Sequence, residues 1–407
     1  MDRFIEILQA LARNKTRTAL TALSVAWGIF MLVVLLAAGT GLENALLYQF
    51  RDDAVNSIWI WPGQTSRPWQ GYRVGRRLQL TNDDHDAIAA LPGVEHITSR
   101  FAVRTDSTIT YRDRVGDFDI RSCHPAHQYL EKTQITSGRF LNDDDLAQRR
   151  KVVVLGAEVV RHLFRSQDPL GEWVDIGGVA YRVIGTFFDD GGLGELSKVY
   201  VPITTAQTAY GGGDRVNAIL FTIGDMTVEQ SQELATEVRR TLAGRHNFDP
   251  ADMRAVRVRN NLERVQSVTS TMKVIRGFLW LVGLGTIAAG VVGVGNIMLV
   301  SVSERTGEIG LRKALGATPA RVVFEVLQEA VLLTSVSGYA GLVAGVAAVE
   351  VLEWSLPTND YMQNPEVDLG VAFTAVGVLV VAGLAAGIIP AWRAAHIDAA
   401  HAIREGS

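Results

Sequence analysis

Four long segments of this 407-residue chain contain no Asp, Glu, Lys or Arg, and they constrain its fold more than any other feature. Each is about as long as the ~20 apolar residues that an α-helix needs to cross a bilayer, or somewhat longer. The sequence therefore predicts a membrane protein with four transmembrane α-helices. Their uncharged lengths are residues 18–42, 277–303, 330–349 and 369–392.

The polar segment between the first two spans is long enough for one or two domains of ordinary size. Its strand-like and helix-like stretches are mixed, so we expect a large α+β domain inserted between helices 1 and 2, with a possible inserted lobe at about 105–195. The expected order is an amphipathic helix at 1–17, helix 1 at 18–42, the inserted domain at 43–272, helix 2 at 277–303, a short helix or loop at 304–320, helix 3 at 321–349, a loop at 350–368, helix 4 at 369–392 and a tail at 393–407.

Local motifs predict some elements of the inserted domain. Residues 57–61 form a strand-like run, and Gly177-Gly178 between two alternating runs predicts a β-hairpin. Thr227 and Gln230 are spaced as a capping box that starts a helix through Leu242. Residues 253–258 are expected to form the last strand, and Asn261 onward could run continuously into the second span. The acidic run at 143–145 predicts a solvated helix start, because it lacks the pattern of a calcium loop.

The loops differ in charge, and this predicts the orientation. Basic residues precede the first span and lie between the second and third, whereas residues 350–368 hold acidic residues and no Lys or Arg. The positive-inside rule then places both termini and the 304–320 loop in the cytoplasm. It places the 43–272 domain on the opposite, extracytoplasmic side of the membrane. The first span could instead be a cleaved signal peptide, but it is longer than the usual signal h-region.

The chain lacks the usual enzyme motifs. It contains neither GxxxxGKS nor GxxxxGKT, and neither HExxH nor GxSxG. Its single cysteine excludes an internal disulfide. Cys123, His124 and His127 resemble a metal cluster, but an ordinary turn around Pro125 is the simpler interpretation. The net charge of −4 gives no reason to expect nucleic acid. We expect no catalytic residue, metal or bound cofactor in this chain.

A charged amphipathic stretch, ERTGEIGLRKALGA, follows the Gly-rich end of the second span. Each of its charges would cost on the order of 2.5–3.5 kcal/mol at the bilayer centre, so the stretch must lie in water or against protein. A short helix with one apolar and one charged side suits docking on a cytoplasmic partner, although a solvated connector is the alternative. The expected contact residues are Glu304, Arg305, Glu308, Ile309, Leu311, Arg312, Lys313 and Leu315.

Small residues recur at helical spacing in three of the predicted spans, where they would let helix backbones approach closely. The spacing does not decide whether this packing lies within one chain or between two. The residues are Gly285, Ala289 and Gly293 in the second span, Gly341 and Gly345 in the third, and Gly383 and Gly387 in the fourth.

The stretch GVGNIMLVSVSERTGEIGLRKALGATPARVVFEVLQEAVLL resembles the signature of the MacB/FtsX-type ABC transporter permeases. The ending PAWRAAHIDAAHAIREG resembles the end of that family. In the inserted domain, LTNDDHDAIAALPGVEHI, SGRFLNDDDLAQRRKVVVLGAEVVRHLF, DPLGEWVDIGGVAYRVIGTF and SKVYVPITTAQTAY resemble successive blocks of the MacB periplasmic core domain. The resemblance covers nearly the whole chain in the right order.

The resemblance implies a multi-pass inner-membrane permease subunit with a cytoplasmic ABC ATPase dimer docked on the 304–316 loop and the N-terminal helix. It also implies a second permease copy, identical or not, besides the surrounding membrane lipids, and allows a periplasmic adaptor and an outer-membrane channel. The chain departs from members with a fused ATPase domain, so ATP and Mg²⁺ are expected on a separate subunit.

Two classes of function follow from the resemblance. The leading expectation is mechanical transmission of ATP-driven change to the inserted domain, driving efflux or extraction of a peptide, drug, toxin or lipoprotein. The alternative is a regulatory permease that controls cell-wall hydrolases or senses antimicrobial peptides. A membrane-anchored enzyme has no catalytic constellation to support it. The substrate and its direction stay open at this point.

Overall fold

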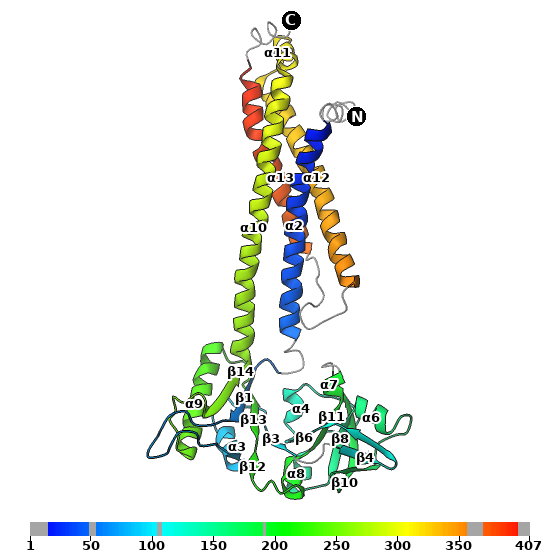
Figure 1. The fold of residues 1–407 in the computed structure, drawn as a ribbon, viewed down its shortest axis with the longest axis vertical. Coiled ribbons are helices and arrows are strands. Elements are labelled where there is room, and N and C mark those ends of the chain that lie inside the picture. The colour runs from blue at the N-terminus through cyan, green and yellow to red at the C-terminus, as the bar shows by residue number, and fades with distance from the viewer. Residues whose placement is uncertain (1–14, 49–53, 104–107, 190–192, 356–368, 398–407) are drawn as a thin grey trace. The chain divides into compact units, whose positions relative to one another are not determined.

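The computed structural model describes residues 15–48, 54–103, 108–189, 193–355 and 369–397 (Figure 1). The chain divides into two compact units. One is helical and comprises residues 1–48 and 269–407, and the other is an α/β unit of residues 49–268. The α/β unit is inserted in the sequence between the first two long helices, which confirms the predicted fold class.

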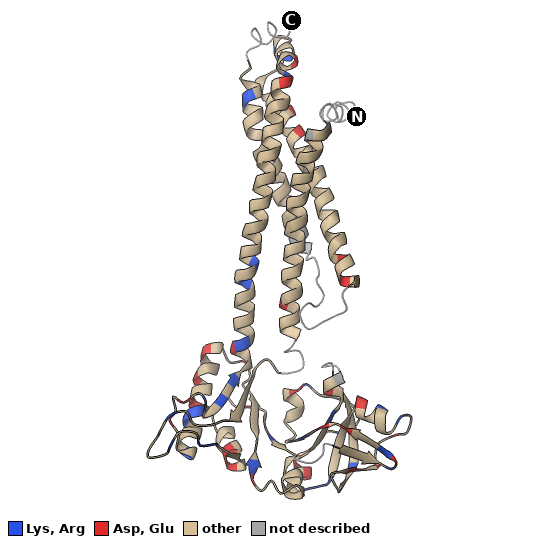
Figure 2. Ribbon diagram, viewed as in Figure 1, with Lys and Arg blue, Asp and Glu red and all other residues tan. Residues whose placement is uncertain are grey.

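Within the described residues, four helices are long and apolar enough to cross a membrane. They are α2 (Lys15–Tyr48), α10 (Asn261–Glu304), α12 (Pro319–Ser355) and α13 (Leu369–Ala395). Each of these helices contains a long stretch without a charged residue, at 18–42, 277–303, 330–349 and 369–392 respectively (Figure 2). Helix α10 begins at Asn261 and continues through the predicted second span without a break. The expected helix at 1–17, loop at 350–368 and tail at 393–407 lie largely outside the described residues.

In the helical unit, α12 packs along both α2 and α13. With 37 residues, α12 is about 55 Å long, which exceeds the ~30 Å of a hydrocarbon core. The part of α12 that could cross the hydrocarbon core is its uncharged stretch at 330–349. Its first turns, which carry charges up to Glu329, precede that stretch. Large apolar side chains fill the space between the helices: Ile29, Leu32, Val33, Val294, Met298 and Leu333 are all buried.

The α/β unit is built on a twelve-stranded sheet. Hydrogen-bonded neighbours follow the order β14-β1-β13-β3-β6-β11-β8-β10-β9-β4-β5, and β7 pairs with β10. The pairs β8–β10 and β6–β11 are parallel and the other pairs in this sheet are antiparallel. The strands are β1 (Ser57–Pro62), β3 (Ile97–Ala102), β4 (Thr108–Tyr111), β5 (Arg114–Asp117), β6 (Asp119–Cys123), β7 (Gln134–Gly138), β8 (Val152–Gly156), β9 (Trp173–Ile176), β10 (Val179–Phe188), β11 (Lys198–Pro202), β13 (Ala218–Thr222) and β14 (Val256–Asn260).

Seven helices and a small second sheet complete this unit within the described residues. The second sheet pairs β2 (Leu80–Thr81) with β12 (Arg215–Val216). The longest helix, α9, packs on β14 and α3. The helices are α3 (Asn82–Ala89), α4 (His127–Leu130), α5 (Asp143–Ala147), α6 (Ala157–Leu163), α7 (Leu193–Leu196), α8 (Ile203–Ala209) and α9 (Val228–His246).

Several local predictions are confirmed. Gly177 and Gly178 both have positive φ, at 57° and 84°, as the turn between β9 and β10 requires. Thr227 caps α9 with Gln230 at the third helical position, and the helix continues past Leu242 to His246. The last strand was predicted at 253–258, but β14 starts at Val256 and ends at Asn260 because its register is set by pairing with β1.

One prediction about the acidic run at 143–145 needs correction. It does start a helix, α5, capped by Asn142. Asp145, however, is fully buried rather than solvated. Its carboxylate accepts hydrogen bonds from Arg139 at 2.6 and 3.0 Å, and Arg150 lies 3.4 Å away. The run was taken for a solvated helix start because its arginine partners belong to the flanking loops.

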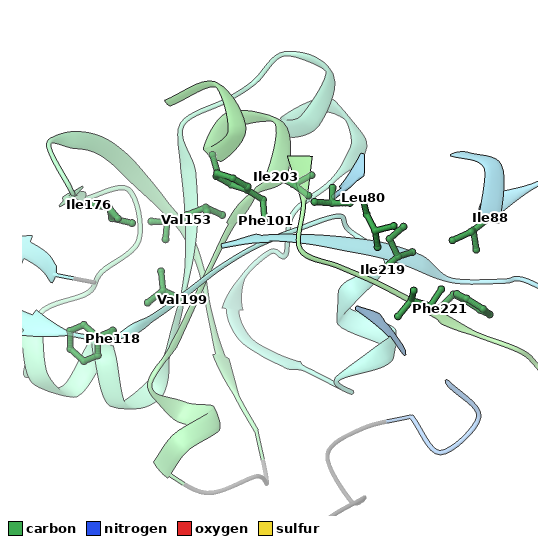
Figure 3. Close-up of a cluster of buried hydrophobic side chains, with 14 of the residues drawn as sticks. Leu80, Ile88, Phe101, Phe118, Val153, Ile176, Val199, Ile203, Ile219 and Phe221 are labelled. Atoms are coloured by element: carbon green, nitrogen blue, oxygen red, sulfur yellow. The ribbon is translucent and has the colours of Figure 1, made fainter. Parts of the chain in front are cut away.

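The core of the α/β unit lies against the sheet. Buried side chains from the strands meet those of the helices that pack on it (Figure 3). Val153 and Val199 come from neighbouring strands, and Ile88 and Ile203 come from α3 and α8. Each is at most 1% exposed. This burial is the main source of stability of the unit, at roughly 1.5–3 kcal/mol per large apolar side chain.

A buried carboxylate, Glu131, gathers cationic and polar groups from several strands. Burial alone would raise its pKa, but Arg100, His127 and Arg121 outweigh burial and hold the pKa well below its usual range. Burial also lowers the pKa of Lys198 to about 8. The groups around Glu131 are Arg100, Arg121 at 2.8 Å, the Tyr200 hydroxyl at 2.5 Å, His127 at 3.3 Å and Lys198 at 3.5 Å.

Two histidines in this part of the unit are held neutral. His124 stacks on His85 with ring centroids 4.3 Å apart, and its Nδ1 accepts the buried Ser99 N–H at 3.0 Å. Burial and the neighbouring His85 lower the pKa of His124 to about 3. His127 is fully buried, and burial lowers its pKa to about 4. Its Nδ1 has no hydrogen-bond partner among the described residues, so a second ring proton would be unsatisfied.

Candidate functional site

A short helix, α11 (Thr306–Ala314), joins α10 to α12 within the helical unit. Arg305 alone separates it from the end of α10. Glu308 lies in its first turn and Arg312 and Lys313 in its last, which suits the helix dipole at both ends. Gly316 has a φ of 98°, which favours glycine, and Pro319 then opens α12. Gly316 and Pro319 therefore account for the end of α11 before the start of α12.

One side of α11 is engaged by the rest of the helical unit. Ile309 is half-buried against the apolar cluster of the bundle, and Gly310 is buried. The Arg305 guanidinium lies 3.4 Å from the carboxylate of Glu329 on α12. The Lys313 ammonium donates hydrogen bonds to two carbonyl oxygens at the end of α13. Arg305, Ile309 and Lys313 therefore stabilise the position of α11 itself. A fourth expected contact residue, Arg312, is exposed but also pairs with Glu325 of α12 at 3.2 Å.

The other side of α11 faces solvent. Leu311 and Leu315 are 53% and 81% exposed. Glu304, Glu308 and Arg312 are exposed as well, and Arg312 lies 3.6 Å from Glu308. An exposed apolar edge beside charged groups is the kind of surface that an amphipathic helix presents to a groove on another protein. We name Glu308, Leu311 and Arg312, with the flanking Glu304 at the end of α10 and Leu315 just after α11, the outer face of α11.

Sequence reasoning missed the partners of α11 on α12. Glu325 lies 3.2 Å from Arg312, and Glu329 lies 3.4 Å from Arg305. These two glutamates are four residues apart and so share one face of α12. That spacing was a usable signal, but nothing in the sequence says which basic residue each would meet.

The glycines predicted for helix packing divide into two groups. A Cβ on Gly341 or Gly345 would meet α2, and one on Gly383 or Gly387 would meet α12. By contrast, a Cβ on Gly285 would meet no atom within 4 Å among the described residues. The face of α10 that packs on α2 instead includes Gly283, Ile287 and Gly290. Of the other two predicted residues of α10, Ala289 is exposed, and a Cβ on Gly293 would meet only Thr21, at 4.0 Å.

Gly341→Val is expected to destabilise the helical unit by about 3 kcal/mol, because its Cβ would overlap the Ala26 carbonyl group and force α12 away from α2. Gly285→Val is the matched control, since that Cβ enters open space. The measurement is the temperature at which the detergent-solubilised chain loses its monodisperse peak in size-exclusion chromatography. Equal midpoints for Gly341→Val and the unchanged chain would contradict the expected close contact.

Two family models match this chain. The MacB-like periplasmic core domain matches residues 18–240, more than half of the chain, and the FtsX-like permease C-terminal region matches residues 280–399. The Macrolide export ATP-binding/permease protein MacB of Rhodospirillum rubrum is 31% identical over 96% of this chain and 58% of its own length. MacB of Neisseria meningitidis serogroup A is 30% identical over 99% of this chain and 61% of its own length. The chain thus spans about six tenths of these relatives.

Among solved structures, the periplasmic region of MacB from Actinobacillus actinomycetemcomitans is 20% identical and aligns over 54% of this chain and 95% of its own, with a TM-score of 0.44. The extracellular domain of the ABC-type transporter YknZ from Gram-positive bacteria is also 20% identical, over 50% of this chain and all of its own, with a TM-score of 0.43.

Four membrane-type helices, an inserted α/β unit and the two family matches define a multi-pass inner-membrane permease. The match of the MacB-like periplasmic core domain covers more than half of the chain and so identifies the family. The chain belongs to the MacB/FtsX-type ABC transporter permeases.

Proposed function

We propose that this chain is the permease subunit through which ATP hydrolysis on a separate ABC ATPase dimer drives a conformational change in the α/β unit. The observation that carries the proposal is the outer face of α11, where Leu311 and Leu315 stay exposed beside Glu308 and Arg312. The ATPase would dock there and would bind ATP and Mg²⁺. With the positive-inside orientation, both termini lie in the cytoplasm and the α/β unit lies in the periplasm.

The product of this cycle would be efflux or extraction of a substrate on the periplasmic side. The relatives named macrolide export proteins support a drug or another small amphipathic compound over a peptide, toxin or lipoprotein. A second permease copy would complete the assembly, and the face of α10 at Gly285, Ala289 and Gly293 is the surface we assign to it or to lipid. A periplasmic adaptor and an outer-membrane channel would complete the export route.

The double variant Leu311→Asp, Leu315→Asp is expected to lower the amount of co-purified ATPase about tenfold or more, because it removes the apolar edge that the helix would lay in a groove of the ATPase. The variant should still insert and run as a monodisperse species, since neither side chain is buried. Val115→Asp is the matched control, because Val115 is 55% exposed but lies on β5 of the α/β unit.

The measurement is the ratio of ATPase to permease after affinity purification in mild detergent, followed by the ATPase rate of the complex. A wild-type ratio in the double variant would show that α11 is not the docking site. Export assayed in intact cells then separates a transporter from a regulatory permease, which would dock the ATPase but move no substrate.

A further inference from the structure

The C-terminal end of α13 has its carbonyl groups satisfied in an unusual way. A helix end leaves its last four carbonyls without partners inside the helix. Here the His396 ring Nδ1 lies 2.8 Å from the Trp392 oxygen, and the N–H groups of His396 and Ile397 reach Arg393 and Ala394 at 3.1 and 3.4 Å. These three contacts are local to the chain end.

Two further acceptors, the oxygen of the last helical residue, Ala395, and that of Ile397 just beyond it, are satisfied from another helix. The Lys313 ammonium donates to the Ala395 oxygen at 2.9 Å and to the Ile397 oxygen at 2.6 Å. An ammonium has three protons to donate, so one side chain can serve both acceptors. Lys313 is also in the last turn of α11, so its positive charge lies at the C-terminal ends of two helices at once.

This contact completes a set of attachments around α11. The chain itself joins α11 to α10 through Arg305 and to α12 through residues 315–318. The ion pairs of Arg305 with Glu329 and of Arg312 with Glu325 add side-chain ties to α12. Helix α13 has no such short covalent link, since Ala395 lies 82 residues after Lys313.

We propose that Lys313 is a positioning residue that fixes the C-terminal end of α13 to α11, so that a displacement of α11 moves α13 together with α10 and α12. The role in the transport cycle rests on the proposed function, but the attachment itself does not. Ala391 and Ala394, which are 1% and 0% exposed, seat this end of α13 in the bundle. The two hydrogen bonds of Lys313 then fix its last turn.

The attachment is tested on the permease alone in lipid nanodiscs. Spin labels at Ala314→Cys on α11 and Arg393→Cys on α13 replace exposed side chains, and the native Cys123 is buried. We expect a narrow distance distribution that becomes about twofold broader or more in Lys313→Met, because the end of α13 is released. Lys313→Arg should restore the narrow distribution, since a guanidinium can also donate to two carbonyls.

Arg312→Gln is the matched control, because Arg312 contacts Glu308 and Glu325 but not α13. Its distribution should equal that of the unchanged residue pair. An unchanged distribution in Lys313→Met would overturn the proposal, whatever the ATPase does.

A second measurement adds the ATPase with ATP and vanadate. Lys313→Met should retain the bound ATPase, since Leu311 and Leu315 are untouched. We expect the Ala314–Arg393 distance to stay fixed in the chain with Lys313 and to change in Lys313→Met, because α11 then moves without α13. A change of that distance in both would refute joint movement. Failure of any ATPase to bind the unaltered permease would instead count against the proposed function, and the nanodisc result would still decide the attachment.

Discussion

Acidification to about pH 4 is expected to lower the free energy of unfolding of the α/β unit by about 6 kcal/mol. The cause is that the unfolded chain binds protons on His124 and His127 that the folded unit excludes. Their folded pKa values are about 3 and about 4, against about 6.5 in an unfolded chain. Each therefore contributes about 3 kcal/mol at this pH.

The sign follows from proton linkage. A histidine whose pKa is depressed by folding costs nothing above about pH 6.5, where both states are neutral. As the pH falls below that value, the unfolded chain gains a proton first and stability declines. The decline for His127 levels off near its folded pKa of about 4. Burial is the largest cause in both residues, and for His124 protonation would also remove the acceptor of the Ser99 N–H.

Urea unfolding of the detergent-solubilised chain at neutral pH and at about pH 4 measures this effect. The chain has eight tryptophans, so the measurement uses a variant that keeps only Trp59. Trp59 is 7% exposed in the sheet, and its fluorescence in that variant reports unfolding of the α/β unit. The variant His127→Gln should reduce the slope of stability against pH by about one proton between pH 6 and 4.5. If His127→Gln left the slope of the unfolding free energy against pH unaltered, His127 would not be a group that takes up a proton on unfolding.

Glu131→Gln is expected to destabilise the α/β unit by about 3–5 kcal/mol at neutral pH. The reason is that Arg100 would keep its charge in a largely buried site without its carboxylate partner. Arg121 and Lys198 would each lose one of two carboxylate partners, keeping Asp119 and Glu195 respectively. The measurement is the urea midpoint of the same fluorescence signal. Glu237→Gln is the matched control, because it also breaks a glutamate–arginine pair, with Arg240, but both side chains are largely exposed.

The control should cost less than about 1 kcal/mol. A comparable loss in both variants would mean that burial adds nothing to the Glu131 cluster. The carboxylate has a depressed pKa, so its contribution is complete at neutral pH and declines only as the pH falls below the ordinary range of a glutamate.

The sequence predicted those features that depend on residues close together in the chain. The four spans follow from uncharged runs, and the cap at Thr227 and the turn at Gly177 follow from local backbone chemistry. It did not predict the Glu131 cluster, because the groups come from positions between 100 and 200 and meet only when distant strands pair. The buried Asp145 was misjudged for a similar reason, since an acidic run beside arginines is compatible with solvent or with burial.

For the candidate site, the sequence predicted a charged amphipathic helix but not which side is used. From the sequence alone, Arg305, Arg312 and Lys313 are equally suited to contact a protein partner. Only the tertiary contacts show that Arg305 meets Glu329 and that Lys313 meets the end of α13. The outer face of α11 is thus smaller than the expected contact set, and its identity as a docking site stays a prediction.

The position of β1 in the sheet has a consequence for biosynthesis. β1 lies between β13 and β14, which follow it by roughly 160 and 195 residues. During synthesis β1 emerges early, but among the described strands it pairs only with β13 and β14, which emerge after most of the unit. Such distant pairing makes folding slow and leaves an unpaired edge exposed. The Arg259 guanidinium, which lies over the rings of Trp59 and Trp61, therefore reaches them last.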